Sequence, residues 1–281
     1  MTPVPNNPIT VGPYRCGEGA DLLLVAGPCV LQRETSLEIA VALKETVDRL
    51  REEGDRINLV FKGSFDKANR TSVDSWRGLG MVEGCRLLAE IKEKTGLPVT
   101  TDIHETVQAD YVANVVDLLQ IPAFLARQTD LLASAAKTGK PVHVKKGQFM
   151  APGDMAFVVA KLAAFGCRQV ILGERGTFFG YGALVNDFRS LVVMRNLGVP
   201  VLFDATHSVQ QPSAADGRSG GKREFVAPLA CAAAAVGIDA LFLETHFDPE
   251  QSPSDGPNML PLDQVGPLLK KVCRIRRAIA Q

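Results

Sequence analysis

The chain has 281 residues, 46% of them hydrophobic and 22% charged, a composition that is typical of a globular protein and excludes a mostly disordered one. Its 31 Lys and Arg residues balance 31 Asp and Glu residues, so we expect no nucleic-acid partner. We expect a cytoplasmic protein, because no apolar run approaches the ~18 residues of a membrane helix, no signal peptide is evident, and the six cysteines are too few for a disulfide scaffold.

Short apolar runs alternate with amphipathic helical stretches along the chain. Because two parallel strands need a helix-length connection, this alternation predicts a parallel sheet. The predicted strands are Leu22–Cys29, Ile57–Phe65, Pro98–His104, Leu118–Phe124, Pro141–Gln148, Gln169–Arg175, Pro200–His207 and Ala240–His246. The helical stretches include Ser36–Glu53, Val82–Lys94, Thr129–Lys137, Arg223–Val236 and Leu262–Ala280.

Eight such units predict an α/β fold, a closed (β/α)₈ TIM barrel that forms one domain over residues 21–281. Residues 1–20 are predicted to form a hairpin that covers the barrel floor. An open doubly wound sheet is the alternative, disfavoured because no Gly-x-Gly-x-x-Gly turn follows the first strand. Two loops rich in Gly, Ser and Pro, Gln211–Arg223 and Asp248–Pro261, are either plain connections or active-site lids.

Almost every predicted strand ends in a charged or hydrogen-bonding residue. The strand ends read AGPCV, FKGSFDKANRTS, TTDIHE, QIPAF, VKKGQF, LGERG, FDATHS and LETHFDP. In a barrel of this type the chemistry lies at the carboxyl ends of the strands. The pattern therefore indicates an enzyme with a densely polar site for an anionic substrate.

Cations gather at these ends although the whole chain is neutral. Lys62, Lys145 and Arg175 end three strands, and the loops beyond add Lys67, Arg70 and Arg127. Lys and Arg together suit phosphate or carboxylate binding. The alternative is that these cations pair with Asp and Glu residues of the same rim.

A metal site is the second candidate. Cys29, His207 and Glu244 end the first, seventh and eighth strands, which are neighbours in a closed barrel at a spacing of about 4.8 Å. One ion could reach all three, with Asp255 as a fourth ligand. A mixed sulfur, nitrogen and oxygen set suits Zn²⁺, Fe²⁺ or Mn²⁺. Alternatively, Cys29 is a small buried apolar residue. His143, inside a strand, is interpreted as structural.

Taken together, the strand ends resemble those of the 3-deoxy-D-manno-octulosonate 8-phosphate synthases, in order from about Leu22 to Pro261, with FDKANR and IPAFLARQTDLL as the most specific segments. The resemblance implies a transferase that condenses phosphoenolpyruvate with D-arabinose 5-phosphate and water, releases inorganic phosphate, acts in lipopolysaccharide biosynthesis and forms a homotetramer. The alternatives are a related synthase for erythrose 4-phosphate or a mannosamine sugar, an aldolase with a lysine imine, and an inactive binding protein.

The resemblance also implies roles for individual residues. One branch of the family binds a divalent metal through the Cys of AGPC, whereas the other has Asn there, so Cys29 points to the metal-dependent branch. Its implied ligands are Cys29, His207, Glu244 and Asp255. Phosphoenolpyruvate is expected at Lys62, Ser64, Lys67, Gln120, Ala123, Lys145 and Arg175.

For arabinose 5-phosphate, the resemblance implies Asn69, Arg70 and Ser72, together with Arg127 of the partner subunit, and Asp102 is expected close to the substrates. The implied catalytic residues are Lys62, Lys145, His207 and Asp255. The lysines act electrostatically in this scheme, because the enol is already a nucleophile and needs no imine.

Overall fold

A closed barrel of parallel strands forms the centre of the protein, as predicted, and this excludes the open sheet. The computed structural model describes residues 5–69, 74–180, 182–215 and 218–280. Neighbouring strands follow the order β11-β8-β7-β6-β5-β4-β3-β14, and β14 pairs with β11 to close the ring. The strands are β3 (Leu22–Gly27), β4 (Ile57–Lys62), β5 (Val99–Asp102), β6 (Leu118–Ile121), β7 (Val142–Lys145), β8 (Val170–Glu174), β11 (Val201–Asp204) and β14 (Ala240–His246).

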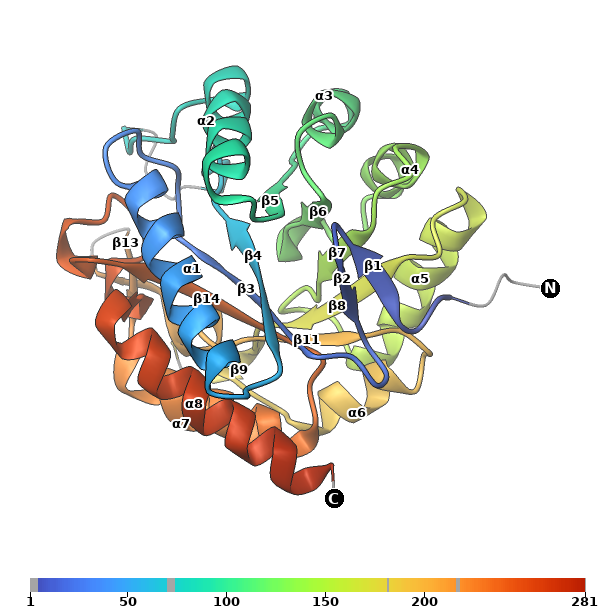
Figure 1. The fold of residues 1–281 in the computed structure, drawn as a ribbon. Coiled ribbons are helices and arrows are strands. Elements are labelled where there is room, and N and C mark those ends of the chain that lie inside the picture. Colours follow the sequence, from blue (N-terminus) through green and yellow to red (C-terminus); the bar gives the residue numbers. More distant parts are fainter. Residues whose placement is uncertain (1–4, 70–73, 181, 216–217, 281) are drawn as a thin grey trace.

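Helices surround this barrel (Figure 1). They are α1 (Ser36–Glu52), α2 (Met81–Thr95), α3 (Ala109–Ala113), α4 (Thr129–Lys137), α5 (Met155–Ala164), α6 (Arg189–Arg195), α7 (Val226–Val236) and α8 (Leu262–Ile279). In α1, Ile39, Leu43, Val47 and Leu50 are buried, a spacing of three or four residues that gives the helix one apolar stripe. Helix α2 has the same kind of stripe, with Gly84, Leu87, Leu88 and Ile91 buried.

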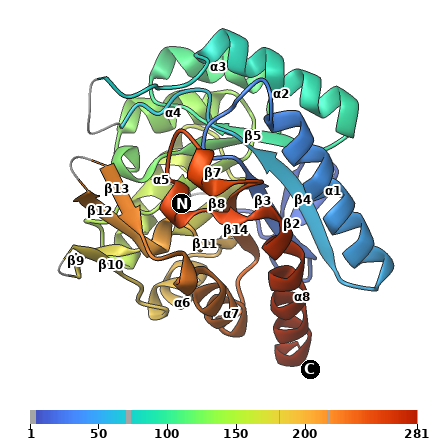
Figure 2. The same ribbon diagram turned by 90° about the vertical axis from the view of Figure 1, so that its left-hand side faces the viewer.

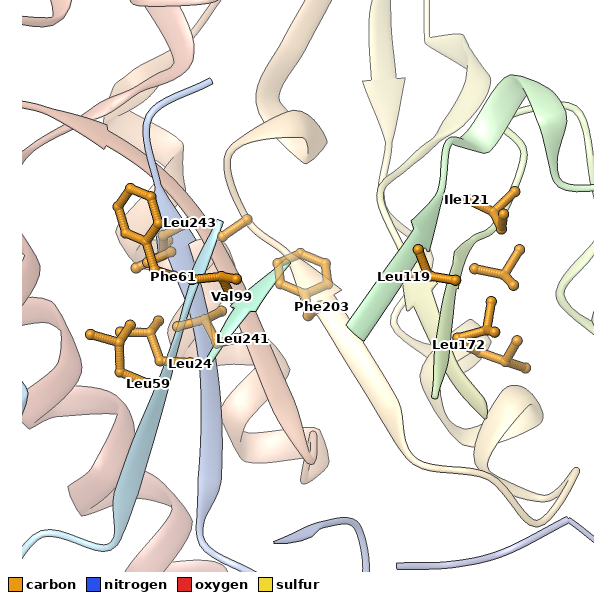
Figure 3. Packing of buried hydrophobic residues seen from close by; sticks show 14 of the residues in the cluster. Leu24, Leu59, Phe61, Val99, Leu119, Ile121, Leu172, Phe203, Leu241 and Leu243 are labelled. Carbon is orange, nitrogen blue, oxygen red and sulfur yellow. The ribbon is translucent and has the colours of Figure 1, made fainter. Parts of the chain in front are cut away.

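Several strands, among them β3, β4 and β14, are apolar on both faces because each face meets a different core. Leu24, Leu59 and Leu241, on three adjacent strands, belong to the layer between the barrel and the helices, part of which Figure 3 shows. Their neighbours Leu23 and Leu202 belong to the cluster inside the barrel. This double burial accounts for the continuous apolar runs in the sequence, and each buried side chain contributes about 1.5–3 kcal/mol.

The N-terminal hairpin lies under the barrel floor, as predicted. It consists of β1 (Ile9–Val11) and β2 (Tyr14–Cys16). Ile9, Val11 and Cys16 are buried in the cluster that fills the barrel. The backbone N–H of Thr10 also donates to Oε1 of Gln169, just before β8, at 3.1 Å. The division into residues 1–20 and 21–281 stays a prediction.

Two further hairpins extend from the carboxyl ends of the barrel strands. They are β9 (Thr177–Gly180) with β10 (Ala183–Val185), and β12 (Gln210–Ala215) with β13 (Arg218–Gly221). Figure 2 shows them together on one side of the molecule. The stretch 211–223, expected to be a loop, is therefore largely a hairpin, in which Gln210 pairs with Gly221 and Gln211 with Gly220. Mutual backbone pairing outweighs the low strand propensity of its Gly and Pro residues.

The stretch 248–261 stays mostly irregular and contains two single-turn 3₁₀ helices, at Pro249–Gln251 and Gly256–Asn258. It ends in β15 (Leu260–Pro261), which pairs with β14. Within the described ranges, none of the helices has the length and apolar character required to span a bilayer.

Candidate active site at the carboxyl ends of the barrel strands

Polar side chains from successive strands converge inside the carboxyl end of the barrel. Strand side chains alternate between faces, so the residue two positions beyond an interior apolar residue also points inward. Val60 and Leu118, for example, lie inside the barrel, and Lys62 and Gln120 follow them on the same face. The buried polar residues placed in this way are Lys62, Asp102, Gln120, Lys145, Asp204 and Glu244.

Two of the three predicted strand-end cations form buried ion pairs. Nζ of Lys62 lies 2.9 Å from Oε1 of Glu244, and Nζ of Lys145 lies 2.5 Å from Oδ2 of Asp204. Nζ of Lys145 also lies 3.8 Å from the ring centroid of Phe242 beneath it. Burial and the nearby Lys62 charge lower the pKa of Lys145, and Asp204 opposes this shift. The alternative of pairing with rim carboxylates therefore holds for both lysines, although the pairs lie inside the site.

Arg175 is the third of these cations, and part of its guanidinium is unused. Its Nη2 donates to Oε1 of Gln210 at 2.9 Å, whereas its Nη1 is buried without a hydrogen-bond partner. Buried polar atoms that lack a partner cost about 1–3 kcal/mol each. The described part of the site holds further atoms of this kind, namely Ser64 Oγ, Asp102 Oδ1, Gln120 Oε1 and Glu244 Oε2. Such a cluster makes this end of the barrel the candidate binding place for a polar ligand, which would give these atoms partners.

Three of the four predicted metal ligands lie together. One ligand atom each from Cys29, Glu244 and Asp255 lies within 4.8 Å of the others. Sγ of Cys29 donates to Oδ2 of Asp255 at 3.0 Å. Burial raises the pKa of the Cys29 thiol, and the carboxylates of Asp255 and Glu244 raise it further. A divalent cation would offset the negative charge gathered here and would give the unpartnered Oε2 of Glu244 a partner. The donor set therefore fits such an ion.

His207, the fourth predicted ligand, lies beside this cluster but outside it. Its Nδ1 is 2.8 Å from Oδ2 of Asp204, and its Nε2 is 3.7 Å from Oε1 of Glu244. The carboxylate of Asp204 thereby orients the imidazole, which is the role that a second carboxylate plays behind many metal-binding histidines.

The other predicted site residues fall into three groups. Ser64 and Ala123 are buried at the carboxyl end of the barrel, and Nζ of Lys67 lies 3.9 Å from Oδ2 of Asp255. Asn69 and Arg127 are exposed in the loops after β4 and β6. Arg70 and Ser72 lie outside the described residues.

Sequence reasoning missed two residues that connect the site. Asp204 contacts both Lys145 and His207. Gln210 accepts from Arg175 and donates to Oδ1 of Asp255 at 3.0 Å. The sequence held a signal for Asp204, which lies two residues beyond Leu202 on the inward face of β11. It held none for Gln210, which begins an unpredicted hairpin.

Comparison with known proteins agrees with the resemblance of the strand ends. The profile of the DAHP synthetase I family matches residues 6–280. A 2-dehydro-3-deoxyphosphooctonate aldolase from Synechococcus sp. is 56% identical over 269 residues, covering 95% of this chain and 93% of the relative. The protein of the same name from Cyanothece sp. is 56% identical over 265 residues, covering 94% and 95%. That from Brucella ovis is 52% identical over 273 residues, covering 97% of each. This name is a synonym for the synthases that the strand ends resemble.

Proposed function

Because this chain belongs to the DAHP synthetase I family, and its relatives are named 2-dehydro-3-deoxyphosphooctonate aldolases, we propose that it condenses phosphoenolpyruvate with D-arabinose 5-phosphate and water. The products are 3-deoxy-D-manno-octulosonate 8-phosphate and inorganic phosphate. The observation that carries this proposal is the unpartnered Nη1 of Arg175, buried in a site that also contains Lys62 and Lys145. A small ligand with both a carboxylate and a phosphate suits this arrangement.

The cations contribute mainly through electrostatics. Lys62, Lys145 and Arg175 neutralise the substrate's negative groups in a site shielded from water, where fixed charges stabilise developing charge by several kcal/mol. Carbon 3 of phosphoenolpyruvate forms a bond to the aldehyde carbon of the sugar, water adds to carbon 2, and the C–O bond to phosphate breaks. Each lysine also faces a carboxylate, Glu244 at 2.9 Å from Lys62 and Asp204 at 2.5 Å from Lys145, which holds its Nζ in place within the site.

We propose that Cys29, His207, Glu244 and Asp255 hold a divalent metal ion, as in the metal-dependent branch that the sequence resembles. When bound, such an ion supplies Lewis acidity to the sugar aldehyde or to the water that adds to carbon 2. The convergence of three of these residues and the direction of His207 Nε2 support the assignment. The chain's own contribution is to hold His207 in place through Asp204 and to keep Glu244 paired with Lys62.

We further propose a cytoplasmic homotetramer that acts in lipopolysaccharide biosynthesis, in which Arg127 of the partner subunit approaches the sugar phosphate. In support, Phe124, three residues before Arg127, is 50% exposed, and Nζ of Lys161 on helix α5 donates to the carbonyl of Arg127 at 2.9 Å. Helix α5 also carries Phe157, which is 69% exposed. Asn69, Arg70 and Ser72 are proposed to bind the same sugar from within one subunit.

The proposed activity is tested by measuring phosphate release from phosphoenolpyruvate with three acceptors in parallel, namely arabinose 5-phosphate, erythrose 4-phosphate and N-acetylmannosamine. Arabinose 5-phosphate should give the highest kcat/KM. A higher value with another acceptor would refute the proposed substrate. Metal analysis of the purified protein, with assays before and after chelation, tests the metal assignment, because activity should fall on chelation and return with Mn²⁺ or Zn²⁺.

A further inference from the structure

A further buried ion pair lies directly behind the site, on the outer face of the strands that lead to Lys145 and Arg175. Lys145 ends β7 and points inward, so the next residue, Lys146, points outward. At the end of the adjacent strand β8, Glu174 points outward, and Arg175, the residue that follows the strand, points inward by the same alternation. The two strands are hydrogen-bonded at this level, where the N–H of Lys146 donates to the carbonyl of Gly173 at 2.7 Å.

Lys146 is completely buried, and its ammonium group joins two loops. Nζ donates to the carbonyls of Gly147 at 3.2 Å and Met150 at 3.4 Å, both in the loop after β7. It also donates to Oγ1 of Thr177, the first residue of β9, at 3.1 Å. Oε1 of Glu174 lies 3.5 Å away. Lys146 thus ties the loop that follows Lys145 to the segment that follows Arg175.

Glu174, with 2% of its side chain exposed, holds the turn around Arg175. Its Oε1 accepts the backbone N–H groups of Arg175 at 3.0 Å and Gly176 at 2.8 Å. Its Oε2 accepts from Oγ of Ser190 on α6 at 2.6 Å. The carboxylate therefore anchors the backbone of Arg175 to the helix layer.

We propose that Lys146 and Glu174 are positioning residues that set the relative placement of Lys145 and Arg175, and through it the affinity for phosphoenolpyruvate. Neither side chain points into the site. A buried ion pair adds little stability compared with apolar residues of similar size, so stability alone does not account for this one. Its hydrogen bonds end on the backbone beside the two substrate-facing cations, and there a small displacement has a large effect on binding and catalysis.

This inference rests on the proposed function, and the test separates the two. The double variant Lys146→Met/Glu174→Gln removes both charges and so leaves no lone charge buried. Phosphoenolpyruvate binding is measured by titration calorimetry, and KM and kcat by phosphate release. We expect the dissociation constant for phosphoenolpyruvate to rise about 10-fold or more, while KM for arabinose 5-phosphate changes less than about twofold.

The matched control is Lys92→Met/Asp117→Asn, on the floor side of the barrel. Nζ of Lys92 lies 2.7 Å from Oδ1 of Asp117, and Oδ2 of Asp117 accepts a backbone N–H, that of Val99, at 3.0 Å. The same two kinds of contact, an ion pair and a carboxylate bonded to a backbone N–H, thus occur at the far end of the strands, although this pair is more exposed, at 41% for Lys92 and 14% for Asp117. This control should bind phosphoenolpyruvate as the wild type does. Wild-type affinity in the variant Lys146→Met/Glu174→Gln, or an equal loss in the control, would overturn the inference.

A third variant keeps the test decisive if the double variant does not fold. Ser190→Ala removes one anchor of Glu174 and no charge, and it should weaken phosphoenolpyruvate binding in the same direction but by less. An unchanged dissociation constant in this variant would count against the inference. If the wild type itself neither binds nor turns over phosphoenolpyruvate, the proposed function fails as well, whereas a normal wild type with unaffected variants refutes the positioning role alone.

Discussion

Oε1 of Glu244 accepts a hydrogen bond from Lys62, while Oε2 of the same carboxylate is buried without a partner. One carboxylate thus faces Lys62, which is proposed to bind phosphoenolpyruvate, on one side and the candidate metal cluster on the other. Both side chains are at most 2% exposed. Loss of either partner would leave a charge with little access to water.

Lys62→Met should therefore affect stability and activity separately. The Glu244 carboxylate would then be buried without its ion-pair partner, which should lower the free energy of unfolding by roughly 3–5 kcal/mol. In addition, kcat/KM for phosphoenolpyruvate should fall at least about 100-fold, because a fixed positive charge is lost from the site. Lys62→Met/Glu244→Gln should recover most of the stability and none of the activity. Urea unfolding and phosphate-release assays measure the two effects. Activity recovered in the double variant would contradict a substrate role for Lys62.

Cys29→Ser should lower the metal content of the purified protein and its activity in parallel, because the hydroxyl is a weaker ligand than a thiolate for a divalent transition metal. The apparent melting temperature should also fall, since a ligand that binds only the folded state stabilises it. Elemental analysis, thermal unfolding and the assay test this together. Cys85→Ser, at a buried thiol on helix α2, is the control and should keep its metal.

Cys29→Asn tests the assignment more sharply, because it reproduces the residue of the metal-independent branch that the sequence resembles. Asp255 and Glu244 remain in place, so the variant should fold. We expect a protein whose activity no longer responds to chelation or to added Mn²⁺. Unchanged dependence on the metal would show that Cys29 is not a ligand.

Borohydride treatment in the presence of phosphoenolpyruvate or the sugar should attach nothing to Lys62 or Lys145. An imine requires a neutral amine. Although burial lowers the pKa of Lys145, its ammonium lies 2.5 Å from the Asp204 carboxylate, which favours the charged form. Intact-mass spectrometry after reduction checks this. A covalent adduct on either lysine would instead identify an imine-forming aldolase.

The inward positions of the site were predictable because two simple rules fix them, namely the alternation of side chains along a strand and the placement of chemistry at strand ends. Lys62, Lys145 and Glu244 follow from these rules alone. Cys29 and Glu244 could be placed together because strands β3 and β14 must be neighbours once the barrel closes. Local sequence was sufficient to place each residue at a strand end, and the closure of the barrel brought Cys29 and Glu244 together.

The pairings inside the site were not predictable in the same way. Lys62 and Glu244 are 182 positions apart, and Lys145 and Asp204 are 59 positions apart, so only the folded barrel shows which carboxylate each lysine meets. Gln210 reaches Arg175 and Asp255 because a hairpin begins at that residue. Its Gly- and Pro-containing sequence favours a loop, and only pairing of its two strands with each other makes it a hairpin.

Gly27→Ala should disturb the site through the backbone. A Cβ atom at Gly27 would lie 2.0 Å from the carbonyl oxygen of Lys62 on the adjacent strand, so β3 and β4 would have to separate. We expect a loss of about 1–3 kcal/mol of unfolding free energy, the usual cost of overpacking, together with a higher KM for phosphoenolpyruvate as Lys62 moves. Gly153→Ala is the control, since nothing lies within 4 Å of its added Cβ. Equal behaviour of the two variants would contradict the close approach.

His143 should make the stability of the protein sensitive to acid. Its ring is fully buried inside the barrel without a hydrogen-bond partner at either nitrogen among the described residues. Burial lowers its pKa to about 3, the charge of Lys145 adds to this, and Asp204 opposes it. The ring is therefore neutral in the folded state at every pH at which the protein is handled, whereas in the unfolded chain it titrates near the ordinary pKa of about 6.5.

The direction of this pH effect follows from which state, the folded or the unfolded one, binds a proton on His143. Between pH 6.5 and about 3 the unfolded chain holds a proton on His143 that the folded protein does not, so the free energy of unfolding falls by about 1.4 kcal/mol for each pH unit of acidification. Above pH 6.5 the residue has no effect. His143→Leu removes this contribution, so the stability difference between wild type and variant should shift by about 2 kcal/mol in favour of the variant between pH 7 and pH 5. Urea unfolding at both pH values measures it, and a difference that does not change with pH would show that His143 takes up a proton in the folded barrel.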